Sequence, residues 1–358
     1  MQEARGGQPL GLQRVSGENA AVLDEFMRVH INPTTSKTKV FPDGSKYIGQ
    51  LVNEKRIGKG VYFYLNGDVY AGDWNDDRVT GSGNYLYASG ERYSGDLRNC
   101  MKQGFGTYFY LNGNRYEGFW KDNLKHGQGN FFYSNGDCFS GAYRKGVKEG
   151  EGEFCLSSGD AYKGKFSKGV KEGPGSIEYL DGRKFKGNFG DDMAEGEGVF
   201  HFPTGEIYSG NFSKSKRHGL GTYSWPEGTQ MTGQFKEDVP QGEIKIKFPG
   251  GNEFEGTLKD GLRQGKGIMR YSNGDIYQGN FHRDLKHGFG SYLYKETGDQ
   301  YEGEWTEDVK NGKGKYKYGN GDFFEGQYKN GLKVGRGRVV FASGETIEGE
   351  FRDDILIE

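Results

Sequence analysis

Large apolar residues and glycines recur along the chain at a fixed spacing, with polar residues between them. A large residue two positions before a glycine, here called the lead residue, returns every 23 positions from Tyr47 to Ile347, with a single spacing of 24 before Tyr301. Another large apolar residue follows each of these glycines, as in "YAGDW" at 70–74. This period indicates a repeat array, and it defines fourteen repeats over residues 40–358.

In most repeats, apolar and polar residues alternate on both sides of Asn-Gly, Asp-Gly or Ser-Gly, a pattern that predicts β-hairpins. Because strand side chains point alternately to the two faces of a sheet, the recurrent rings and glycines share one face. We therefore expect an all-β fold, an elongated single-layer antiparallel sheet of stacked hairpins. The residues predicted to hold it together include Tyr70, Gly72, Trp74, Tyr116, Gly118, Trp120, Tyr301, Gly303 and Trp305.

The fixed glycines have a packing explanation. We expect Tyr64 to face Tyr70 across the hairpin turn, through a loop with an odd number of residues. Tyr62 would then lie opposite Gly72, and its ring could lie flat over the bare glycine. The one inserted residue, in segment 292–301, falls within the expected turn, where insertions are tolerated.

The opposite face of the sheet varies along the array. In the first repeats it carries apolar residues, and in later repeats it is mostly charged. An exposed apolar strip often marks a contact surface, although single exposed apolar residues are ordinary on any protein. Our candidate partner-binding residues on this strip are Val61, Phe63, Leu65, Phe109, Leu111 and Phe119.

The N-terminal extension contains a predicted helix. Residues 1–18 are predicted to be disordered and residues 19–31 to form a short amphipathic helix with Asn19 as its N-cap. A polar linker, residues 32–39, joins the helix to the array. A helix this short is marginal alone, so it either folds back as a cap on the first hairpin or docks on a partner or a second copy. Its apolar face, also a candidate partner-binding surface, consists of Val22, Leu23, Phe26 and Met27.

The array ends in a half repeat that contains Ile355, Leu356 and Ile357. Its last strand would leave an open sheet edge, and open edges pair readily with other strands. Self-association, or addition of a partner strand, at this terminal edge is our hypothesis, with these three residues as candidate contacts. An unchanged mass in solution after deletion of residues 355–358 would contradict it.

Composition favours a folded chain whose core depends on aromatic rings. Only 33% of residues are apolar and the mean hydropathy is −0.87, yet 15% are aromatic, and disordered chains are poor in aromatics.

The net charge of −2 gives no general attraction to nucleic acid or anionic membranes. Cys100, Cys138 and Cys155 form no CxxC motif, which is typical of a reduced intracellular protein. No apolar run approaches the about 20 residues of a transmembrane helix.

Motifs for catalysis or metal binding are missing from the sequence. It contains no GxxxxGK[ST], GxSxG, HExxH or CxxC, and we expect its carboxylates to hold no fixed place in the repeat. His126, His218 and His287 share one slot but lie several repeats apart, too far to share a metal within one chain. A metal site between two copies is the alternative. We expect no enzyme, and no catalytic, cofactor or metal site.

The pattern YxGxW…HGxGxYxYxxG resembles that of the MORN-repeat family. Segment 116–136, "YEGFWKDNLKHGQGNFFYSNG", shows the pattern in full, and segment 292–305 is similar to the ETG-bearing repeat of radial-spoke-head MORN proteins. The resemblance implies one β-hairpin per repeat and a role as a scaffold or interaction module. Members of the family include radial-spoke-head proteins of cilia and cytoskeletal scaffolds of unicellular parasites.

These features favour a non-enzymatic scaffold in a ciliary-axonemal, radial-spoke-like or other cytoskeletal assembly. The expected location is the cytoplasm and cytoskeleton, with the axoneme of a cilium or flagellum as the specific site, and the expected partners are proteins of that assembly. One alternative is a peripheral membrane adaptor that binds acidic phospholipids, as proposed for arrays of this family. However, the basic residues of segment 144–186 alternate with acidic ones, which weakens their attraction to lipid. A further alternative is a regulatory subunit of an enzyme supplied in trans.

Overall fold

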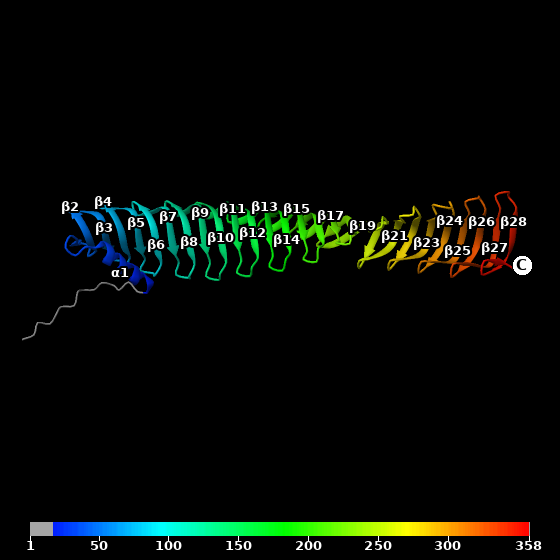
Figure 1. Cartoon of the computed structure of the whole chain (residues 1–358), viewed down its shortest axis with the longest axis horizontal. Helices are drawn as coiled ribbons and strands as arrows, with labels where there is room; N and C mark the ends of the chain where they lie inside the picture. Colours follow the sequence, from blue (N-terminus) through cyan, green and yellow to red (C-terminus); the bar gives the residue numbers. More distant parts are fainter. Residues whose placement is uncertain (1–16, 358) are drawn as a thin grey trace, which may run out of the picture. The chain divides into compact units, whose positions relative to one another are not determined.

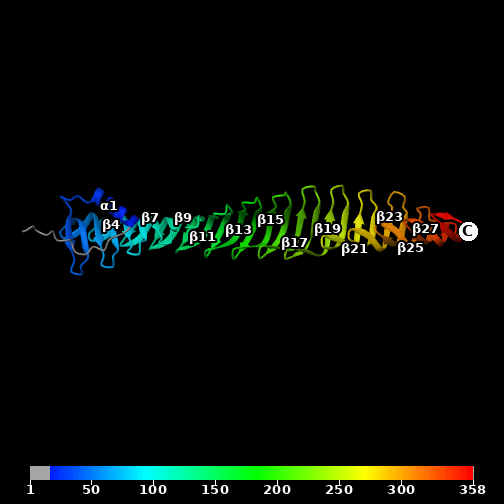
Figure 2. The ribbon, with the colours of Figure 1, turned by 90° about the horizontal axis from the view of Figure 1, so that it is seen from below.

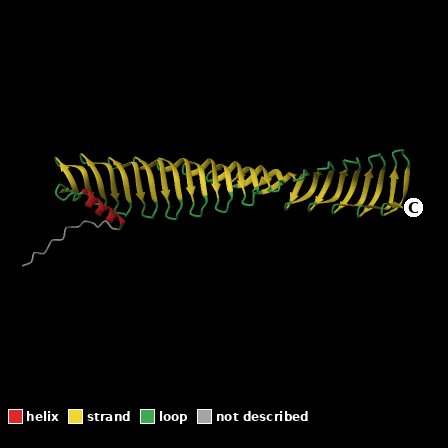
Figure 3. Cartoon of the chain, viewed as in Figure 1, coloured by secondary structure: helices red, strands yellow, loops and turns green. Residues whose placement is uncertain are grey.

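The computed structural model describes residues 17–357, which form one helix and a single open antiparallel sheet of 29 strands (Figure 1; Figure 3). The predicted fold class, a single-layer sheet of stacked hairpins, is confirmed. The chain divides into two compact units, residues 1–180 and 181–358, which we describe separately. The disorder predicted for residues 1–18 falls almost wholly outside the described residues.

The N-terminal unit contains helix α1 (Glu18–His30) and thirteen strands. The helix lies within one residue of its predicted bounds, whereas β1 begins inside the segment expected to be a linker. Each strand pairs antiparallel with its neighbours in the sequence. The strands are β1 (Lys37–Val40), β2 (Lys46–Val52), β3 (Lys55–Phe63), β4 (Val69–Asn75), β5 (Arg78–Leu86), β6 (Arg92–Arg98), β7 (Met101–Phe109), β8 (Arg115–Lys121), β9 (Leu124–Phe132), β10 (Cys138–Arg144), β11 (Val147–Cys155), β12 (Ala161–Ser167) and β13 (Val170–Glu178).

The C-terminal unit contains sixteen strands with the same antiparallel, sequential pairing. The strands are β14 (Lys184–Gly190), β15 (Met193–His201), β16 (Ile207–Ser213), β17 (Lys216–Ser224), β18 (Gln230–Lys236), β19 (Val239–Lys247), β20 (Glu253–Lys259), β21 (Leu262–Arg270), β22 (Ile276–His282), β23 (Leu285–Leu293), β24 (Gln300–Thr306), β25 (Val309–Lys317), β26 (Phe323–Lys329), β27 (Leu332–Val340), β28 (Thr346–Arg352) and β29 (Ile355–Leu356).

Two kinds of turn alternate along the sheet. The predicted turn after β3 is a five-residue loop, in which Tyr64 N–H donates to the Asp68 carbonyl at 3.0 Å and Gly67 N–H donates to the Tyr64 carbonyl at 3.1 Å. The second turn, between β4 and β5, has only two residues, Asp76 and Asp77, with φ of 48° and 67°. Aspartate, asparagine and glycine tolerate this left-handed conformation better than other residues, which makes such pairs suitable for tight hairpins. The sequence analysis missed this second turn.

The register of the hairpins differs from the predicted one by two residues. Tyr62, not Tyr64, faces Tyr70, and Gly60 faces Gly72. Because a slip of two residues keeps every side chain on its own face, the recurrent rings and glycines still share one face of the sheet. The predicted pairing of rings with glycines across the strands is therefore wrong, whereas the prediction of a single ring face is right.

The lead rings cover glycines of their own strand and of the next one. A Cβ atom on Gly72 would lie 2.6 Å from Tyr70 Cζ, and one on Gly83, the residue opposite Gly72, would lie 2.6 Å from Tyr70 Cε2. The Tyr70 hydroxyl donates to the Asp73 carbonyl at 3.2 Å and holds the ring along the strand. The glycines thus leave space for aromatic rings, as predicted. However, each ring extends along its own strand to reach them, and does not come from the residue opposite the glycine.

One repeat lacks both the ring and a glycine. Met231 is its lead residue, and Ile244 stands where the other repeats have the glycine that faces Gly233. Ile244 is buried, and its Cγ2 lies 2.7 Å from the site of a Cβ on Gly233. The branched side chain fills space that a lead ring would take, so the two changes compensate each other. This supports ring packing as the reason for the fixed glycines.

Tryptophans join successive repeats on the ring face. Trp120 meets the lead ring of its own repeat, Tyr116, edge-on at 5.1 Å and that of the preceding repeat, Tyr93, edge-on at 5.6 Å. Its indole N–H donates to the Gly106 carbonyl at 3.0 Å. Trp74 and Trp305 make the equivalent indole bonds. The core is a row of such contacts between neighbouring repeats, so stability accumulates repeat by repeat.

The repeat with the inserted residue keeps the common pairing. Tyr292 faces Tyr301 in the same way that Tyr62 faces Tyr70. The extra residue lies in the loop between β23 and β24, which Tyr294 N–H closes by donating to the Asp299 carbonyl at 2.9 Å. The prediction that the insertion falls within a turn is confirmed.

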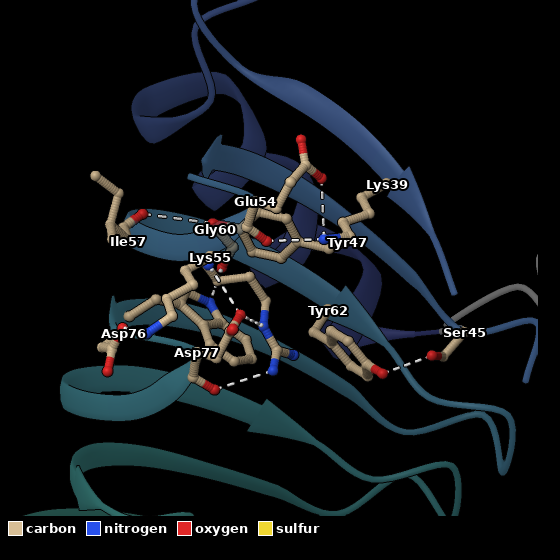
Figure 4. Close-up of polar contacts among 12 residues, drawn as sticks. Lys39, Ser45, Tyr47, Glu54, Lys55, Ile57, Gly60, Tyr62, Asp76 and Asp77 are labelled. Atoms are coloured by element: carbon tan, nitrogen blue, oxygen red, sulfur yellow. Dashed lines mark hydrogen bonds and ion pairs between the residues drawn. The ribbon is translucent and has the colours of Figure 1, made fainter. Parts of the chain in front are cut away.

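The first strand, β1, differs from the strands that follow. Lys39 stands opposite the lead residue Tyr47, where later repeats carry an aromatic or apolar residue. Its ammonium group pairs with the Glu54 carboxylate at 3.1 Å, at the turn after β2 (Figure 4). A charged edge strand of four residues is one of the ways by which sheets limit pairing with other chains.

Candidate protein-interaction surfaces

Helix α1 packs on the face of the sheet opposite the rings, which we call the variable face (Figure 2). Phe26, which is 7% exposed, lies in a buried cluster with Val61, Val69, Ala71 and Leu86 of β3, β4 and β5. The helix thus folds back on its own chain, one of the two alternatives that the sequence left open. Partly buried around the cluster are Val22, Leu23, Met27, Ile31 and Phe63.

Asn19 has a different role from the one predicted. The helix begins at Glu18, and its N-cap is Gly17, without a side-chain capping bond. Asn19 is buried, and its amide donates to the carbonyls of Gly90 and Glu91, each at 3.2 Å. These carbonyls belong to the loop between β5 and β6, so Asn19 fastens the first turn of the helix to the sheet. The N-cap assignment is wrong because this amide makes a tertiary contact instead.

Two phenylalanines beyond the helix are exposed on the variable face. Phe105 of β7 and Phe119 of β8 are 54% and 49% exposed, face each other in register, and meet edge to face at 5.7 Å. An open hollow of about 440 Å³ reaches from Phe105 to Phe26 and His30 of α1. We call Phe105 and Phe119 the Phe105 patch. The sequence analysis named Phe119 but missed Phe105, which the cross-strand register could have identified.

The other predicted contact residues of this strip lie apart from the Phe105 patch. Phe109 is half-buried beneath the Arg92 guanidinium, whose carbon is 4.0 Å from the ring centroid. Leu111 is exposed at a loop tip, 3.5 Å from the site of a Cβ on Gly90 in the preceding loop. Leu65 is exposed in the equivalent place two repeats earlier, where it lies against the loop that contains Gly44. Both leucines therefore help to stack successive loops.

The C-terminal residues form the short strand β29 at the end of the sheet. Ile355 and Leu356 pair with β28, and Ile357 N–H donates to the Glu350 carbonyl at 2.9 Å. All three apolar side chains, those of Ile355, Leu356 and Ile357, are exposed. The structure places them at a sheet edge that is two residues long.

The variable face of the C-terminal unit is also hollowed. Two open hollows, of about 600 and 470 Å³, lie on either side of Phe289, which is exposed. Side chains of both charge signs line them, including Lys266 and Glu255 in the first and Lys315 and Glu325 in the second. This face therefore offers an apolar ring among alternating charges.

Basic side chains form a row over the aromatic rings on the other face. The ammonium group of Lys102 lies 4.3 Å from the Tyr108 centroid and 5.0 Å from the Trp120 centroid. Burial lowers the pKa of Lys102 to about 8, and that of Lys310 likewise. The sequence analysis did not identify this row, although its members precede the GxG pair at a constant distance. The same slot holds Arg56, Lys125, Lys148, Lys171, Arg217, Arg263, Lys286 and Lys333.

Aspartate and asparagine side chains link the loops of successive repeats. Asp137 accepts a hydrogen bond from Ser157 N–H at 2.8 Å, and Asp275 accepts one from Lys295 N–H at 2.9 Å. The expectation that carboxylates hold no fixed place is therefore wrong for this slot, two positions before the lead residue. The same bond is made by Asp68, Asn114, Asp160, Asn252, Asp299 and Asp322.

The two-residue turns carry a second series of such bonds along the opposite margin. Asp77 accepts hydrogen bonds from the backbone N–H and the guanidinium of Arg56, both at 2.9 Å, and Figure 4 shows this carboxylate beside the pair Lys55 and Asp76. Asp238 and Asp284 repeat the arrangement with arginines of the preceding repeats, Arg217 and Arg263. Both margins of the sheet are thus bonded from repeat to repeat.

We expect the array to lose stability in acid. Backbone hydrogen bonds, from Ser157 and Lys295 respectively, are the largest cause that lowers the pKa of Asp137 and of Asp275. A carboxylate whose pKa is lower in the folded state stabilises that state above its unfolded pKa of about 3.9, and this contribution is lost as the pH falls through the folded value. Thermal melts followed by circular dichroism should show a melting temperature that falls steeply below about pH 4. A constant melting temperature down to about pH 3 would show that the hydrogen bonds of these aspartates do not stabilise the array.

Among residues 17–357, no group of three or more His, Cys, Asp or Glu side chains is placed to hold a metal ion. His126 and His218 lie in separate repeats, while His287 has a neighbouring ring, His282, at 5.6 Å. No helix in the described part of the chain has the length and apolar character needed to cross a membrane.

Comparison with solved structures gives distant likenesses. The chain is similar to the TCP domain of SAS-4 (dCPAP) of Drosophila melanogaster, solved in complex with a proline-rich motif of Ana2 (dSTIL), at 15% identity and a TM-score of 0.31, over 49% of this chain and 90% of that one. It is also similar to a mutant TCP10 domain of Danio rerio CPAP, at 14% identity and a TM-score of 0.21, over 67% of this chain and 96% of that one. At these TM-scores neither likeness bears on function. No curated protein matches the sequence.

A family model described as the MORN repeat matches most of the chain. It leaves out residues 231–253, the repeat in which Met231 and Ile244 replace the ring and the glycine. The matched segments are 47–69, 70–92, 93–115, 116–138, 139–161, 162–182, 185–207, 208–230, 254–276, 277–296, 301–323 and 324–346. The protein belongs to the MORN-repeat family.

Proposed function

We propose that the protein is a non-enzymatic scaffold that binds other proteins through its variable face, within a cytoskeletal assembly. The observation that carries this proposal is the packing of α1. This amphipathic helix lies on that face, where Phe26 packs with Val61 and Leu86. The rings and glycines of the other face are occupied by packing within the sheet. The variable face is therefore the one left to bind partners.

The Phe105 patch extends this binding surface beyond α1. Phe105 and Phe119 are about half exposed, and the hollow beside them continues to the end of the helix at His30. Two adjacent exposed rings lie next to the surface on which α1 packs. Such rings can bind the apolar side chains of a second helix or of an extended segment. The specific form of the proposal is a radial-spoke-like assembly of the ciliary or flagellar axoneme, which the ETG-bearing segment 292–305 supports by resemblance.

Fractionation of ciliated cells that express the tagged protein tests this proposal. We expect the protein to stay with axonemes after detergent removes the membrane, and the double variant Phe105→Ser/Phe119→Ser to be released without a change in melting temperature. Leu111→Ser removes another exposed apolar side chain of the same unit and serves as the matched control. Complete extraction of the wild-type protein by detergent, or equal retention of the double variant, would contradict the proposal.

A peripheral membrane adaptor is the second candidate, and the basic row on the ring face favours it. Lys102 and Lys125 lie in adjacent repeats of this row, which presents a series of basic groups that could attract acidic lipid headgroups. Burial lowers the pKa of both lysines, however, and the whole chain carries a net charge of −2. Flotation with phosphatidylserine and phosphoinositide vesicles separates the candidates, because salt-sensitive binding would favour the adaptor over the scaffold.

Self-association at β29 is a separate proposal within the scaffold function. The exposed Ile355, Leu356 and Ile357 lie at the sheet edge, where a second strand could add. Deletion of residues 355–358 should then reduce the mass of the protein in solution, measured by light scattering. An unchanged mass would exclude this edge as the contact.

A further inference from the structure

We infer that Cys138 and Cys155 form a reversible dithiol site, which closes to an intramolecular disulfide by exchange with a small-molecule disulfide such as oxidised glutathione. The two cysteines lie on the paired strands β10 and β11, joined by the turn at Lys145 and Gly146. In the sheet register they stand directly opposite each other. The sequence alone showed three separate cysteines, and only the register brings two of them together.

The opposed register of the pair places the two cysteines within the range of separations that a disulfide spans. Residues directly opposite each other in an antiparallel pair have Cα atoms about 4.5 or 5.5 Å apart, and disulfides span Cα separations of about 4.4–6.8 Å. Opposed side chains also point to the same face, here the variable face. The irregularity in this strand pair lies between Gly141 and Tyr143, away from the cysteines.

Neighbouring side chains leave both thiols accessible to a small oxidant. Each cysteine is partly exposed. Phe132 stands opposite Cys138 on β9, and Ala161 stands opposite Cys155 on β12. Burial, with a hydrogen bond to Cys138 second, raises the pKa of Cys155 to about 11. Cys155 therefore keeps its proton at neutral pH, and we assign the first attack to Cys138.

The reaction balances as two successive thiol–disulfide exchanges. The Cys138 thiolate attacks one sulfur of oxidised glutathione, a mixed disulfide forms at Cys138, and one glutathione leaves as its thiol. Cys155 then loses its proton and attacks Cys138 Sγ, and the second glutathione leaves. Two protein thiols are oxidised and one disulfide is reduced to two thiols, so excess reduced glutathione reopens the site.

A closed disulfide would cross-link one hairpin of the N-terminal unit, that of β10 and β11. In an array whose repeats contact only their neighbours, local opening can begin at any repeat. The cross-link would hold β10 to β11 at the end away from their two-residue turn, and so prevent this repeat from opening. Oxidation thereby becomes a reversible means of stiffening the array.

Cys100 is an internal control for the reaction of the opposed pair. This cysteine is exposed in the two-residue turn between β6 and β7. Its oxidation by glutathione can give only a mixed disulfide or a link to another molecule. The Cys100→Ser variant leaves the opposed pair intact and removes such links.

Equilibration with reduced and oxidised glutathione, followed by alkylation and peptide mapping without reductant, tests the inference. Trypsin cuts after Arg144 and Lys145, so a closed site yields two peptides joined by a disulfide. We expect this joined pair in wild-type protein and in Cys100→Ser, and its loss on addition of reduced glutathione. Cys138→Ser should instead leave glutathione on Cys155, and Cys155→Ser should leave it on Cys138.

Two results would overturn the inference. In the first, Cys138 and Cys155 each carry glutathione and no joined peptides appear. In the second, both remain alkylatable under conditions that modify Cys100. A second readout is amide hydrogen exchange over residues 138–155, which should slow by at least tenfold in the closed form of Cys100→Ser, and an unchanged rate would show that closure does not stiffen the repeat.

Discussion

Replacement of Gly118 by valine should destabilise the array by about 3 kcal/mol or more, because the new side chain has no space. A Cβ atom at this position would lie 2.5 Å from Gly129 Cα, 2.6 Å from Tyr116 Oη and 2.7 Å from the Gln128 carbonyl oxygen. Two of these three atoms belong to the backbone of β9, so the clash is relieved only if the strands separate. Urea unfolding and limited proteolysis should show weaker pairing and faster cleavage at this hairpin than in the wild type.

Gln128→Val is the matched control for this prediction. It places the same side chain on β9, next to Gly129, but on the exposed variable face. An exposed substitution of this kind changes stability by about 0.5 kcal/mol or less. Cleavage of Gly118→Val no faster than that of the wild type would refute the clash.

A rescue experiment separates ring clashes from backbone clashes. At Gly129 the three atoms nearest to a new Cβ all belong to the Tyr116 side chain. Gly129→Ile should therefore be destabilising alone and recover much of its stability when combined with Tyr116→Met, which recreates the natural pairing of Met231 with Ile244. Gly118→Val should not be rescued by Tyr116→Met, since its backbone contacts remain. Equal rescue of both would show that the ring alone limits each site.

Phe26→Asp should release α1 from the sheet. Truncation of a buried phenylalanine costs about 3–5 kcal/mol, and a buried carboxylate without a partner adds to that cost. Because a 13-residue helix is marginal when isolated, α1 should unfold once detached. Hydrogen exchange should then show loss of protection in residues 18–30, while the strands of the C-terminal unit keep theirs.

Val29→Asp is the control for the helix. Val29 lies on the same helix but is 58% exposed, so the added charge should leave the helix in place. Release of α1 also uncovers Val61, Val69 and Leu86, and we expect the Phe26→Asp variant to bind a hydrophobic dye that the control does not bind. Undiminished protection of α1 in Phe26→Asp would show that other contacts, such as that of Asn19, suffice to hold the helix.

The face of each recurrent residue could be predicted from the sequence, whereas the register could not. A shift from the pair Tyr64–Tyr70 to the pair Tyr62–Tyr70 leaves every side chain on its own face, so the hydrophobic pattern fits both. The hydrogen bonds of the loop, such as that between Tyr64 N–H and the Asp68 carbonyl, decide between them. The opposed cysteines depend on the other strand pairing, across the two-residue turn at Lys145 and Gly146, which the sequence analysis missed.

The position of the helix depends on contacts that its own sequence does not contain. Its amphipathic pattern predicts an apolar face but not the surface that this face covers. That surface is set by Val61, Val69 and Leu86, and the direction of the helix by the bonds of Asn19 to a loop more than 70 residues away in sequence. The exposure of Phe105 likewise depends on where α1 ends, so the interaction surface emerges only in the folded chain.

The indole bond of each tryptophan to the preceding strand has a mechanical consequence. Under tension across the strands of one unit, the strand pairs carry the load in series, so the weakest pair opens first, and a released repeat of 23 residues extends by about 80 Å. Trp120 of β8 donates its indole N–H to the Gly106 carbonyl of β7, and this bond must break when that pair opens. We expect strand pairs without such a tryptophan to open at lower force. The order of opening within a unit would then follow from the positions of its tryptophans.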